Sequence, residues 1–120
     1  AFGVDFDHNG ECFNTETNSN ILGFTLDWML DNSLIEVPTI VKVDVDGIEH
    51  MILKGARNVL SHTDCKSILI EVNDDFGEQS KNVQALLTEY GYSLRDKLHG
   101  DSTENSELFS SFYNQIWVRK

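Results

Sequence analysis

The stretch of sequence that decides the fold is "IVKVDVDGIEHMILKGA", residues 40–56. It begins as an apolar run in which every second position carries a charge, namely Lys42, Asp44 and Asp46. Because successive side chains point to opposite faces of a strand, the charges share one face and the valines share the other. Apolar residues then recur at helical spacing, with Gly55 and Ala56 as small packing positions on the same face. The pattern predicts a strand over 39–45 that turns directly into a helix over 48–61.

Downstream of this stretch, the chain alternates between strand and helix patterns. A second strand is predicted over 67–73, where isoleucine and valine alternate with other residues. A helix follows around residues 83–90, with Gly91 where a C-cap glycine belongs. The rest of the chain is predicted to contain a strand over 92–97, a polar loop over 99–111 and a closing strand over 113–120.

Two shorter patterns precede the decisive stretch. Residues 2–14 alternate around an Asn-Gly pair, which predicts a β-hairpin. Leu26, Met29 and Leu30 share one helical face, and Thr25 is placed to cap that helix.

Strands that alternate with helices are typical of βαβ units, so the sequence predicts an α/β fold with a mostly parallel sheet. Strands 39–45 and 67–73 are expected to be parallel neighbours joined by helix 48–61. The last two strands are expected to form an antiparallel edge. Only the two parallel segments have the pattern of interior strands, fewer than a complete doubly wound domain contains. Residues 1–120 are therefore interpreted as a single partial domain.

Composition limits the classes of function. The 120 residues carry a net charge of −11, which disfavours attraction to nucleic acid or anionic lipid. No apolar run approaches the roughly 20 residues of a membrane span, and no secretory signal is visible. Cys12 and Cys65 have no CxxC spacing, so a reduced, cytoplasmic chain is expected. The first residue is Ala1 rather than Met, which fits either a trimmed chain or sequence missing upstream.

The charged residues of the two strands have competing interpretations. Lys42 and Glu71 fall on the same face of neighbouring strands, so they could form a structural ion pair. The alternative is a catalytic role for Glu71. Asp46 fits an N-cap position with Glu49 reaching back toward it, as in a capping box, and Gly47 would then supply a tight turn.

Asp44 stands at the carboxyl end of its strand, which is the edge where open α/β sheets bind ligands. This position favours a functional carboxylate. The alternative is a carboxylate that only accepts backbone hydrogen bonds at the start of the following helix.

Taken together, these motifs resemble the FkbM family of S-adenosylmethionine-dependent methyltransferases. The resemblance rests on four segments in order: Leu26-Asp27, Lys42 to Glu49, Leu53 to Ala56, and Ile70 to Val72. It covers about residues 22–97 and returns in "YNQIWV" at 113–118. One departure is Asp46, which keeps the charge of the family's Glu but shortens its reach.

The resemblance implies a Rossmann-like methyltransferase fold, of which this chain would be the C-terminal, acceptor-side half. Members of the family bind S-adenosylmethionine through a glycine-rich turn after their first strand and an acidic residue after the second. No Gly-x-Gly-x-x-Gly occurs in this chain. The cofactor-binding half is therefore expected upstream, and the 120 residues alone are expected to be inactive. The family also implies a saccharide or another small hydroxyl-bearing molecule as methyl acceptor.

Methyl transfer to a hydroxyl benefits from a base or a metal that withdraws the hydroxyl proton. Asp44 is the first candidate for that base, or for a group that orients the acceptor. Glu71 and Asn73, at the end of the adjacent strand, are the second candidates. The same oxygen cluster could hold Mg²⁺, although carboxylates at helix starts are common without a metal.

Other residues are expected to be structural. His50 is expected to be exposed rather than catalytic. The remaining histidines, His8, His62 and His99, form no ligand set. The aromatic residues Trp28, Phe76 and Trp117 are expected in the core or covering the sheet.

A different class of protein fits the same pattern. A non-catalytic α/β module for interaction, dimerisation or carbohydrate recognition could have kept this fold and lost the cofactor half. With half a sheet, the edge of strand 39–45 would be unpaired, which would invite formation of a homodimer.

Overall fold

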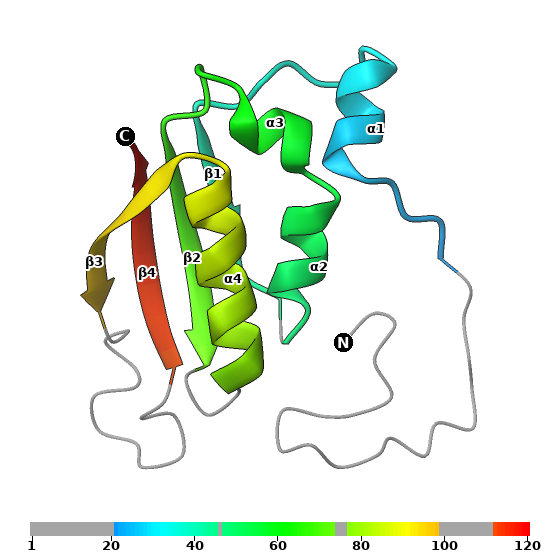
Figure 1. The fold of residues 1–120 in the computed structure, drawn as a ribbon. Helices are drawn as coiled ribbons and strands as arrows, with labels where there is room; N and C mark the ends of the chain where they lie inside the picture. Colours follow the sequence, from blue (N-terminus) through cyan, green and yellow to red (C-terminus); the bar gives the residue numbers. More distant parts are fainter. Residues whose placement is uncertain (1–20, 46, 74–76, 99–111) are drawn as a thin grey trace, which may run out of the picture.

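The computed structural model describes residues 21–45, 47–73, 77–98 and 112–120, and Figure 1 shows how their helices and strands are arranged. The strands are β1 (Ile40–Val43), β2 (Ser67–Asn73), β3 (Tyr92–Leu98) and β4 (Phe112–Arg119). The helices are α1 (Leu26–Asp31), α2 (Glu49–Lys54), α3 (Arg57–Ser61) and α4 (Gly77–Glu89). The predicted hairpin over 2–14 and the polar loop over 99–111 lie outside the described residues.

The strands form one sheet in the order β1-β2-β4-β3. β1 and β2 are parallel, with Val43 opposite Ile70, which confirms the predicted pairing. β4 is antiparallel to both β2 and β3, which confirms the antiparallel pairing of the last two strands. The expectation of a mostly parallel sheet is wrong for these four strands, because β4 inserts in the opposite direction beside β2 and leaves one parallel pair.

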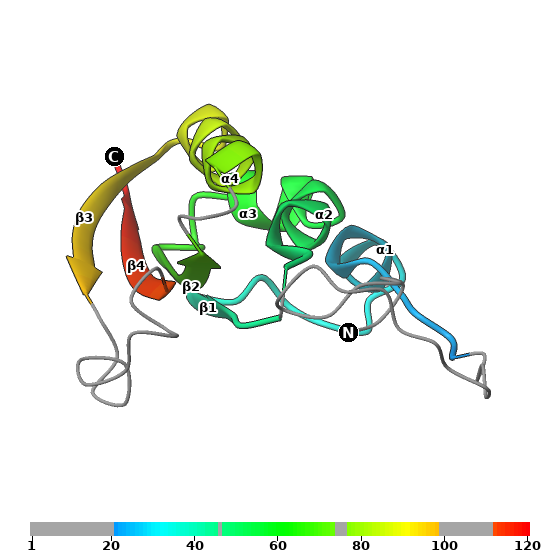
Figure 2. The same cartoon turned by 90° about the horizontal axis from the view of Figure 1, so that it is seen from below.

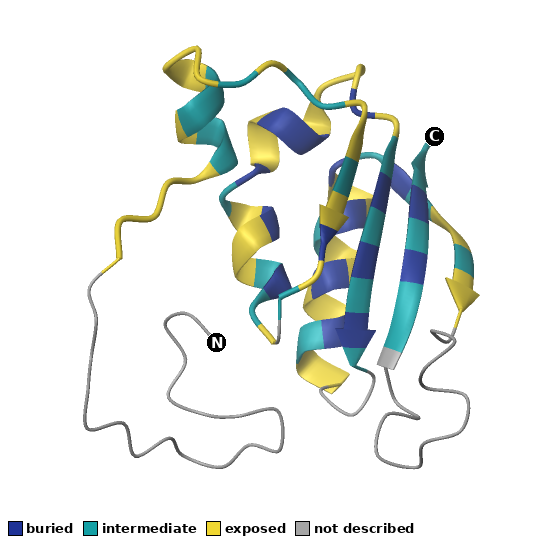
Figure 3. Ribbon diagram, turned by 180° about the vertical axis from the view of Figure 1, so that it is seen from behind, coloured by how far each residue is buried: buried dark blue, intermediate teal, exposed yellow. Residues whose placement is uncertain are grey.

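The helices α2, α3 and α4 lie on one side of the sheet, as the end view in Figure 2 shows. In β2, burial alternates residue by residue, with Ile68, Ile70 and Val72 fully or almost fully buried (Figure 3). Val83 and Leu87 of α4 are buried in the same core. The alternation predicted from the sequence is thus confirmed: one face of β2 packs against helices, and the other carries Leu69, Glu71 and Asn73.

Two of the predictions about aromatic residues can be compared with the structure, since Phe76 lies outside the described residues. Trp117 is buried in the core, as predicted. Trp28 is 43% exposed and stacks on Phe24 with ring centroids 4.4 Å apart, so the prediction of a covered position is wrong for this residue. The reason is that α1 has no buried residue and lies beside α2 and α3 rather than over the sheet (Figure 1).

The prediction of one continuous helix over 48–61 is wrong, because α2 and α3 are separate helices with a break at 55–56. α1 packs against this break. A Cβ on Gly55 would lie 2.9 Å from Cγ2 of Thr25, so only glycine lets the two segments approach this closely. The backbone N–H of Asp27 also donates to the carbonyl of Gly55 at 3.1 Å.

The Asp27 side chain provides the cap that α3 lacks locally. Its carboxylate accepts hydrogen bonds from the backbone N–H groups of Asn58 and Val59, both at 3.0 Å. Carboxylates at this position satisfy otherwise unpaired N–H groups of a helix start. The Leu-Asp segment and the Lys-Gly-Ala segment noted in the sequence therefore contact each other, and they fix α1 against the helix layer.

The predicted caps at Thr25 and Gly91 are both confirmed. The Thr25 hydroxyl accepts from the N–H of Trp28 at 3.1 Å and caps α1. Gly91 follows α4 with φ of +91°, and its N–H donates to the carbonyl of Thr88 at 3.1 Å. No helix in the described ranges combines the length and the apolar character that a membrane span requires.

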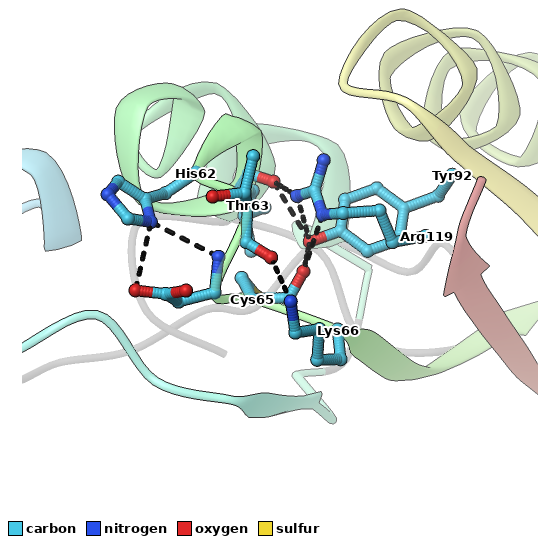
Figure 4. Close-up of polar contacts among 8 residues, drawn as sticks. His62, Thr63, Cys65, Lys66, Tyr92 and Arg119 are labelled. Atoms are coloured by element: carbon cyan, nitrogen blue, oxygen red, sulfur yellow. Dashed lines mark hydrogen bonds and ion pairs between the residues drawn. The ribbon is translucent and has the colours of Figure 1, made fainter.

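The amino end of β2 is closed by a network around Arg119, shown in Figure 4. The Arg119 guanidinium donates to the carbonyls of Cys65 at 2.7 Å and Tyr90 at 3.3 Å, and to that of Leu60. The buried Tyr92 hydroxyl lies 2.9 Å from the carbonyl oxygen of Leu60 and 3.0 Å from that of Cys65, so its single O–H is shared between these two acceptors. Burial first, and then interaction with Cys65, raises the pKa of Tyr92 above its ordinary 10.0. These contacts tie the last residues of β4 to the end of α3.

Candidate functional site

β1 and β2 run in the same direction, so their carboxyl ends point to one end of the sheet (Figure 1). β1 ends opposite Ile70, and β2 continues for three more residues to Asn73. Asp44 follows directly after β1, while Glu71 and Asn73 belong to the last three residues of β2. The register pairs Val43 with Ile70, so continuing it by one residue places Asp44 beside Glu71. All three lie on the face opposite the helices, because Ile70 points into the core.

Asp44 is held by Lys42. The Lys42 Nζ lies 2.6 Å from Oδ2 of Asp44, and the two side chains are 60% and 46% exposed. Asp44, through its hydrogen bond and its charge, raises the pKa of Lys42, and the charge of Glu71 adds a smaller contribution in the same direction. The prediction of a buried Lys42–Glu71 ion pair is therefore wrong, because the Lys42 side chain is exposed. Asp44 raises the pKa of Lys42 more than Glu71 does. The cause is local: Lys42 and Asp44 are neighbours on one face of an edge strand, and Lys42 aligns with Leu69 rather than with Glu71.

Glu49 is a buried carboxylate at the same end of the sheet, only 5% exposed. Its Oε1 accepts from the backbone N–H of Gly47 at 3.2 Å, and Oε2 accepts from the side-chain amide of Gln79 in α4. Glu49 thus ties the turn after β1 to the first turn of α4. Gly47 has φ of +100°, which confirms the predicted glycine turn.

The prediction that Asp46 is the N-cap of α2 is wrong. The N-cap residue is Ile48, without a side-chain cap, and Glu49 reaches back to Gly47. The Asp46 side chain itself lies outside the described residues.

Two grooves adjoin this end of the sheet. The first, here called the edge groove, has a volume of about 460 Å³ and runs along β1. Its lining consists of 24–26, 41–45, Met51, Ile52 and Gly55, and it is mostly apolar. β1 pairs with β2 on one side, and no other described strand pairs with its opposite side.

The second, here called the polar groove, has a volume of about 420 Å³ and lies between the first turns of α2 and α4. Its lining residues are Gly47, His50, Gly77, Glu78, Gln79 and Asn82. The prediction that His50 is exposed is wrong, since the residue is half-buried. Its Nδ1 atom is buried and has no hydrogen-bond partner in the described part of the chain.

Sequence reasoning missed the polar groove and the bridging role of Glu49. One signal was available: Gln79 and Asn82 stand at i, i+3 on α4, where side chains share a face. The contact of α4 with α2 was not visible in the sequence. Within the ranges that the structure describes, no three His, Cys, Asp or Glu side chains gather in a way that could hold a metal ion.

The edge groove is not enclosed by the described residues. The edge groove is open along β1, and among the described residues of its lining only Lys42 and Asp44 are charged. Small-molecule sites are usually concavities that bury most of their ligand.

Comparison with known proteins identifies the family. Profiles of protein families match residues 14–94 to the methyltransferase FkbM domain. Searches among curated proteins and among solved structures gave no match. Because the matched range spans more than half of the 120 residues, the chain belongs to the methyltransferase FkbM domain family.

Proposed function

We propose that this chain is the acceptor-side half of a Rossmann-like methyltransferase domain that transfers a methyl group from S-adenosylmethionine to a hydroxyl of a saccharide or another small molecule. The observation that carries the proposal is the position of Asp44. It is a half-exposed carboxylate at the carboxyl end of a parallel strand, held at 2.6 Å by Lys42, in a chain of the FkbM domain family. Open α/β sheets bind ligands at this end of their strands.

In this proposal, Asp44 accepts the proton of the acceptor hydroxyl and orients that hydroxyl. S-adenosylmethionine, when bound, supplies the methyl group. Lys42 keeps the Asp44 carboxylate in place, and Glu71 and Asn73 on the same face offer further oxygen and amide groups to the acceptor. General-base help of this kind contributes about 10²- to 10⁴-fold in rate. The proposal requires no metal, and Mg²⁺ held by the same oxygens is a variant of it.

The cofactor-binding half is proposed to pack on the edge groove. β1 is an edge strand among the described residues, and apolar side chains around it are exposed: Phe24 at 56%, Met51 at 59% and Ile52 at 37%. Exposed apolar surface of this kind marks an interaction site. The 120 residues alone are therefore expected to bind S-adenosylmethionine weakly or not at all. The proposal retains a cytoplasmic location, in line with the buried free thiol of Cys65.

The test is a methyl-transfer assay on protein made from the complete coding sequence, with isotope-labelled S-adenosylmethionine and a panel of hydroxyl compounds. We expect Asp44→Asn to lower turnover by about 10²-fold or more, because the base is lost. Cofactor affinity, measured by calorimetry, should stay within about twofold because Asp44 acts on the acceptor. Asp64→Asn, an exposed carboxylate beside His62 at the other end of β2, is the matched control. Unchanged turnover in Asp44→Asn would remove Asp44 from the mechanism.

A second candidate is a non-catalytic module that dimerises through β1. The exposed apolar residues at the edge groove favour it, because an unpaired edge strand can pair with a second copy. Light scattering of the protein from the complete coding sequence separates the two. A dimer that binds no S-adenosylmethionine and is broken by Val41→Lys would favour the module.

A further inference from the structure

The row of residues that contains Asp44 and Glu71 continues across the sheet onto β4 and β3. Glu71 of β2 lies directly opposite Asn114 of β4, and Asn114 lies directly opposite Leu98 of β3. Residues directly opposite each other on antiparallel strands point to the same face of a sheet. Asp44, Glu71, Asn114 and Leu98 therefore form one row, here called the site row. Figure 3 views the sheet from the face that carries this row.

The neighbours of Asn114 on β4 show which face its side chain occupies. Gln115 is fully buried on the helix side, where its Oε1 accepts from the indole N–H of Trp117 at 2.9 Å. Lys97 is opposite Gln115 and places its ammonium 4.0 Å from the centre of the Tyr113 ring, so these side chains share the helix side. Asn114 stands between Tyr113 and Gln115 in the chain and points to the opposite face, where it is half-buried. Of these two consecutive amides, Gln115 thus supports the core and Asn114 faces the proposed site.

The spacing of the strands sets the length that an acceptor needs in order to reach Asn114. Neighbouring strands of a sheet are about 4.8 Å apart. Asp44 directly follows β1 and Asn114 belongs to β4, with β2 between these two strands. The backbones of Asp44 and Asn114 are therefore about 10 Å apart, which is longer than a single sugar ring. An acceptor whose reacting hydroxyl lies at Asp44 reaches Asn114 only through a second ring or an arm of similar length.

The β4 end of the site row combines a hydrogen-bonding amide with apolar side chains. The Asn114 side chain supplies two donors and a carbonyl acceptor. Leu98, at the far end of the row, is 55% exposed. Ile116, two residues after Asn114 on the same face, is half-buried, and so is Leu69, its partner on β2. A ring with hydroxyls on its edge and C–H groups on its face fits this combination.

We propose that Asn114 binds the part of the acceptor that lies beyond the methylated hydroxyl, and that the acceptor contains at least two linked rings. Asp44 remains the group at the reacting hydroxyl. Asn114 contributes to the binding and the choice of the acceptor rather than to the chemical step, and Leu98 adds an apolar contact to the second ring. This inference deepens the proposed function and rests on it for the position of the reacting hydroxyl at Asp44.

The length of the acceptor is tested with pairs of methyl glycosides that contain one or two sugar rings. The pairs are built from glucose, galactose, mannose and rhamnose, and methyl transfer to them is measured with isotope-labelled S-adenosylmethionine on protein from the complete coding sequence. We expect kcat/KM for at least one two-ring glycoside to exceed that of its one-ring partner by about tenfold, because the second ring adds binding contacts. Equal or higher values for the one-ring glycoside in every pair, or no methylation of any two-ring glycoside, would overturn the inference.

Two variants of similar shape isolate the hydrogen bonds of Asn114. Asn114→Val removes the polar group and Asn114→Thr keeps a hydroxyl, and both new residues suit a strand. For the two-ring glycoside, Asn114→Val should raise KM about three- to tenfold with kcat unchanged, and Asn114→Thr should recover part of the loss. KM for the one-ring partner should stay within about twofold.

Ser93→Val is the matched control, because Ser93 lies on the same face at the amino end of the sheet, opposite Val118. It should change neither KM. An unchanged KM for the two-ring glycoside in Asn114→Val, or an equal rise for both glycosides, would remove Asn114 from the acceptor site.

Calorimetry with S-adenosylmethionine separates failure of this inference from failure of the proposed function. Cofactor binding and methyl transfer that Asn114→Val leaves unchanged would overturn the inference and leave the methyltransferase proposal standing. Absence of both cofactor binding and methyl transfer in the unmodified protein would overturn the proposed function, and this inference with it. Loss of cofactor binding in Asn114→Val would place Asn114 against the cofactor and overturn its assignment to the acceptor.

Discussion

The polar groups at the two ends of the sheet differ in burial and in the partners of their hydrogen bonds. At the amino end of β2, Arg119 and Tyr92 are buried or half-buried and donate to backbone carbonyls around α3 (Figure 4). At the carboxyl end, Asp44 is 46% exposed, and its ion pair with Lys42 joins two residues of the same strand segment. Grooves open beside this end, along β1 and between α2 and α4.

Under the proposed function, this difference separates groups that stabilise the fold from groups that act on a ligand. Hydrogen bonds at the amino end satisfy buried backbone carbonyls, and losing them would leave polar groups unpaired. Exposed groups at the carboxyl end contribute little to stability and are available to a ligand. Substitutions at the amino end should therefore change stability, and substitutions of exposed groups at the carboxyl end should change binding or turnover.

The largest effect on stability is expected for Arg119→Met. The substitution keeps much of the aliphatic stem but removes the donors to three backbone carbonyls and to the Tyr92 hydroxyl. We expect a loss of about 2–4 kcal/mol in the free energy of unfolding, measured by urea denaturation. Arg57→Met is the matched control, because its ion pair with Glu89 is exposed and should contribute less than about 1 kcal/mol. Equal losses in the two variants would break the comparison.

Glu49→Leu tests whether the carboxyl end also contains a stabilising contact. The substitution leaves the N–H of Gly47 and the amide of Gln79 without this acceptor. We expect a loss of about 1–3 kcal/mol in the free energy of unfolding. Glu89→Leu, which alters a half-exposed carboxylate of α4, serves as control. A cost below that of Glu89→Leu would mean that the Glu49 contacts do not stabilise the carboxyl end.

Local sequence patterns predicted the elements that depend on local forces. β2 was predicted over its full span of 67–73, because alternation and burial agree along that strand. The Thr25 cap and Gly91 were predicted because capping involves residues within one helical turn. The parallel pairing followed from the strand–helix–strand order, and the structure confirms it.

The predictions that are wrong involve contacts between distant residues. α2 and α3 separate because Thr25 and Asp27, about thirty positions earlier, pack on Gly55 and cap α3. The apolar spacing of residues 48–61 does not predict this contact. The polar groove likewise requires Gln79 to lie beside Glu49, thirty positions away. The candidate residues Asp44, Glu71 and Asn73 could be chosen from strand parity alone, although their proposed roles stay predictions.

Alkaline pH should destabilise the folded chain through Tyr92, which lies at the amino end of β2. Burial first, then the neighbouring cysteine, raises the pKa of Tyr92 in the folded chain above the 10.0 of an unfolded tyrosine. Above pH 10.0 the unfolded chain therefore holds fewer protons than the folded chain, and stability falls as pH rises. The slope should reach about 1.4 kcal/mol per pH unit for this residue. Tyr92→Phe should remove that part of the slope, measured by urea denaturation between neutral and alkaline pH. An unchanged slope would show that Tyr92 does not titrate differently on unfolding.

Lys42→Met should have the smallest effect on stability and so tests the carboxyl end most sharply. The Lys42 side chain is 60% exposed. The attraction within an exposed ion pair adds little to stability, because side-chain entropy and salt screening offset most of it. The urea midpoint should therefore match that of Lys66→Met, an exposed lysine at the amino end whose Nζ donates to the Thr63 carbonyl. In protein from the complete coding sequence, however, loss of the ammonium frees the Asp44 carboxylate to rotate. Turnover should then fall about two- to tenfold, less than in Asp44→Asn, while Lys66→Met leaves turnover unchanged. A lower midpoint with normal turnover would reverse the roles assigned to the two ends, because Lys42 would then stabilise the edge strand without supporting the site.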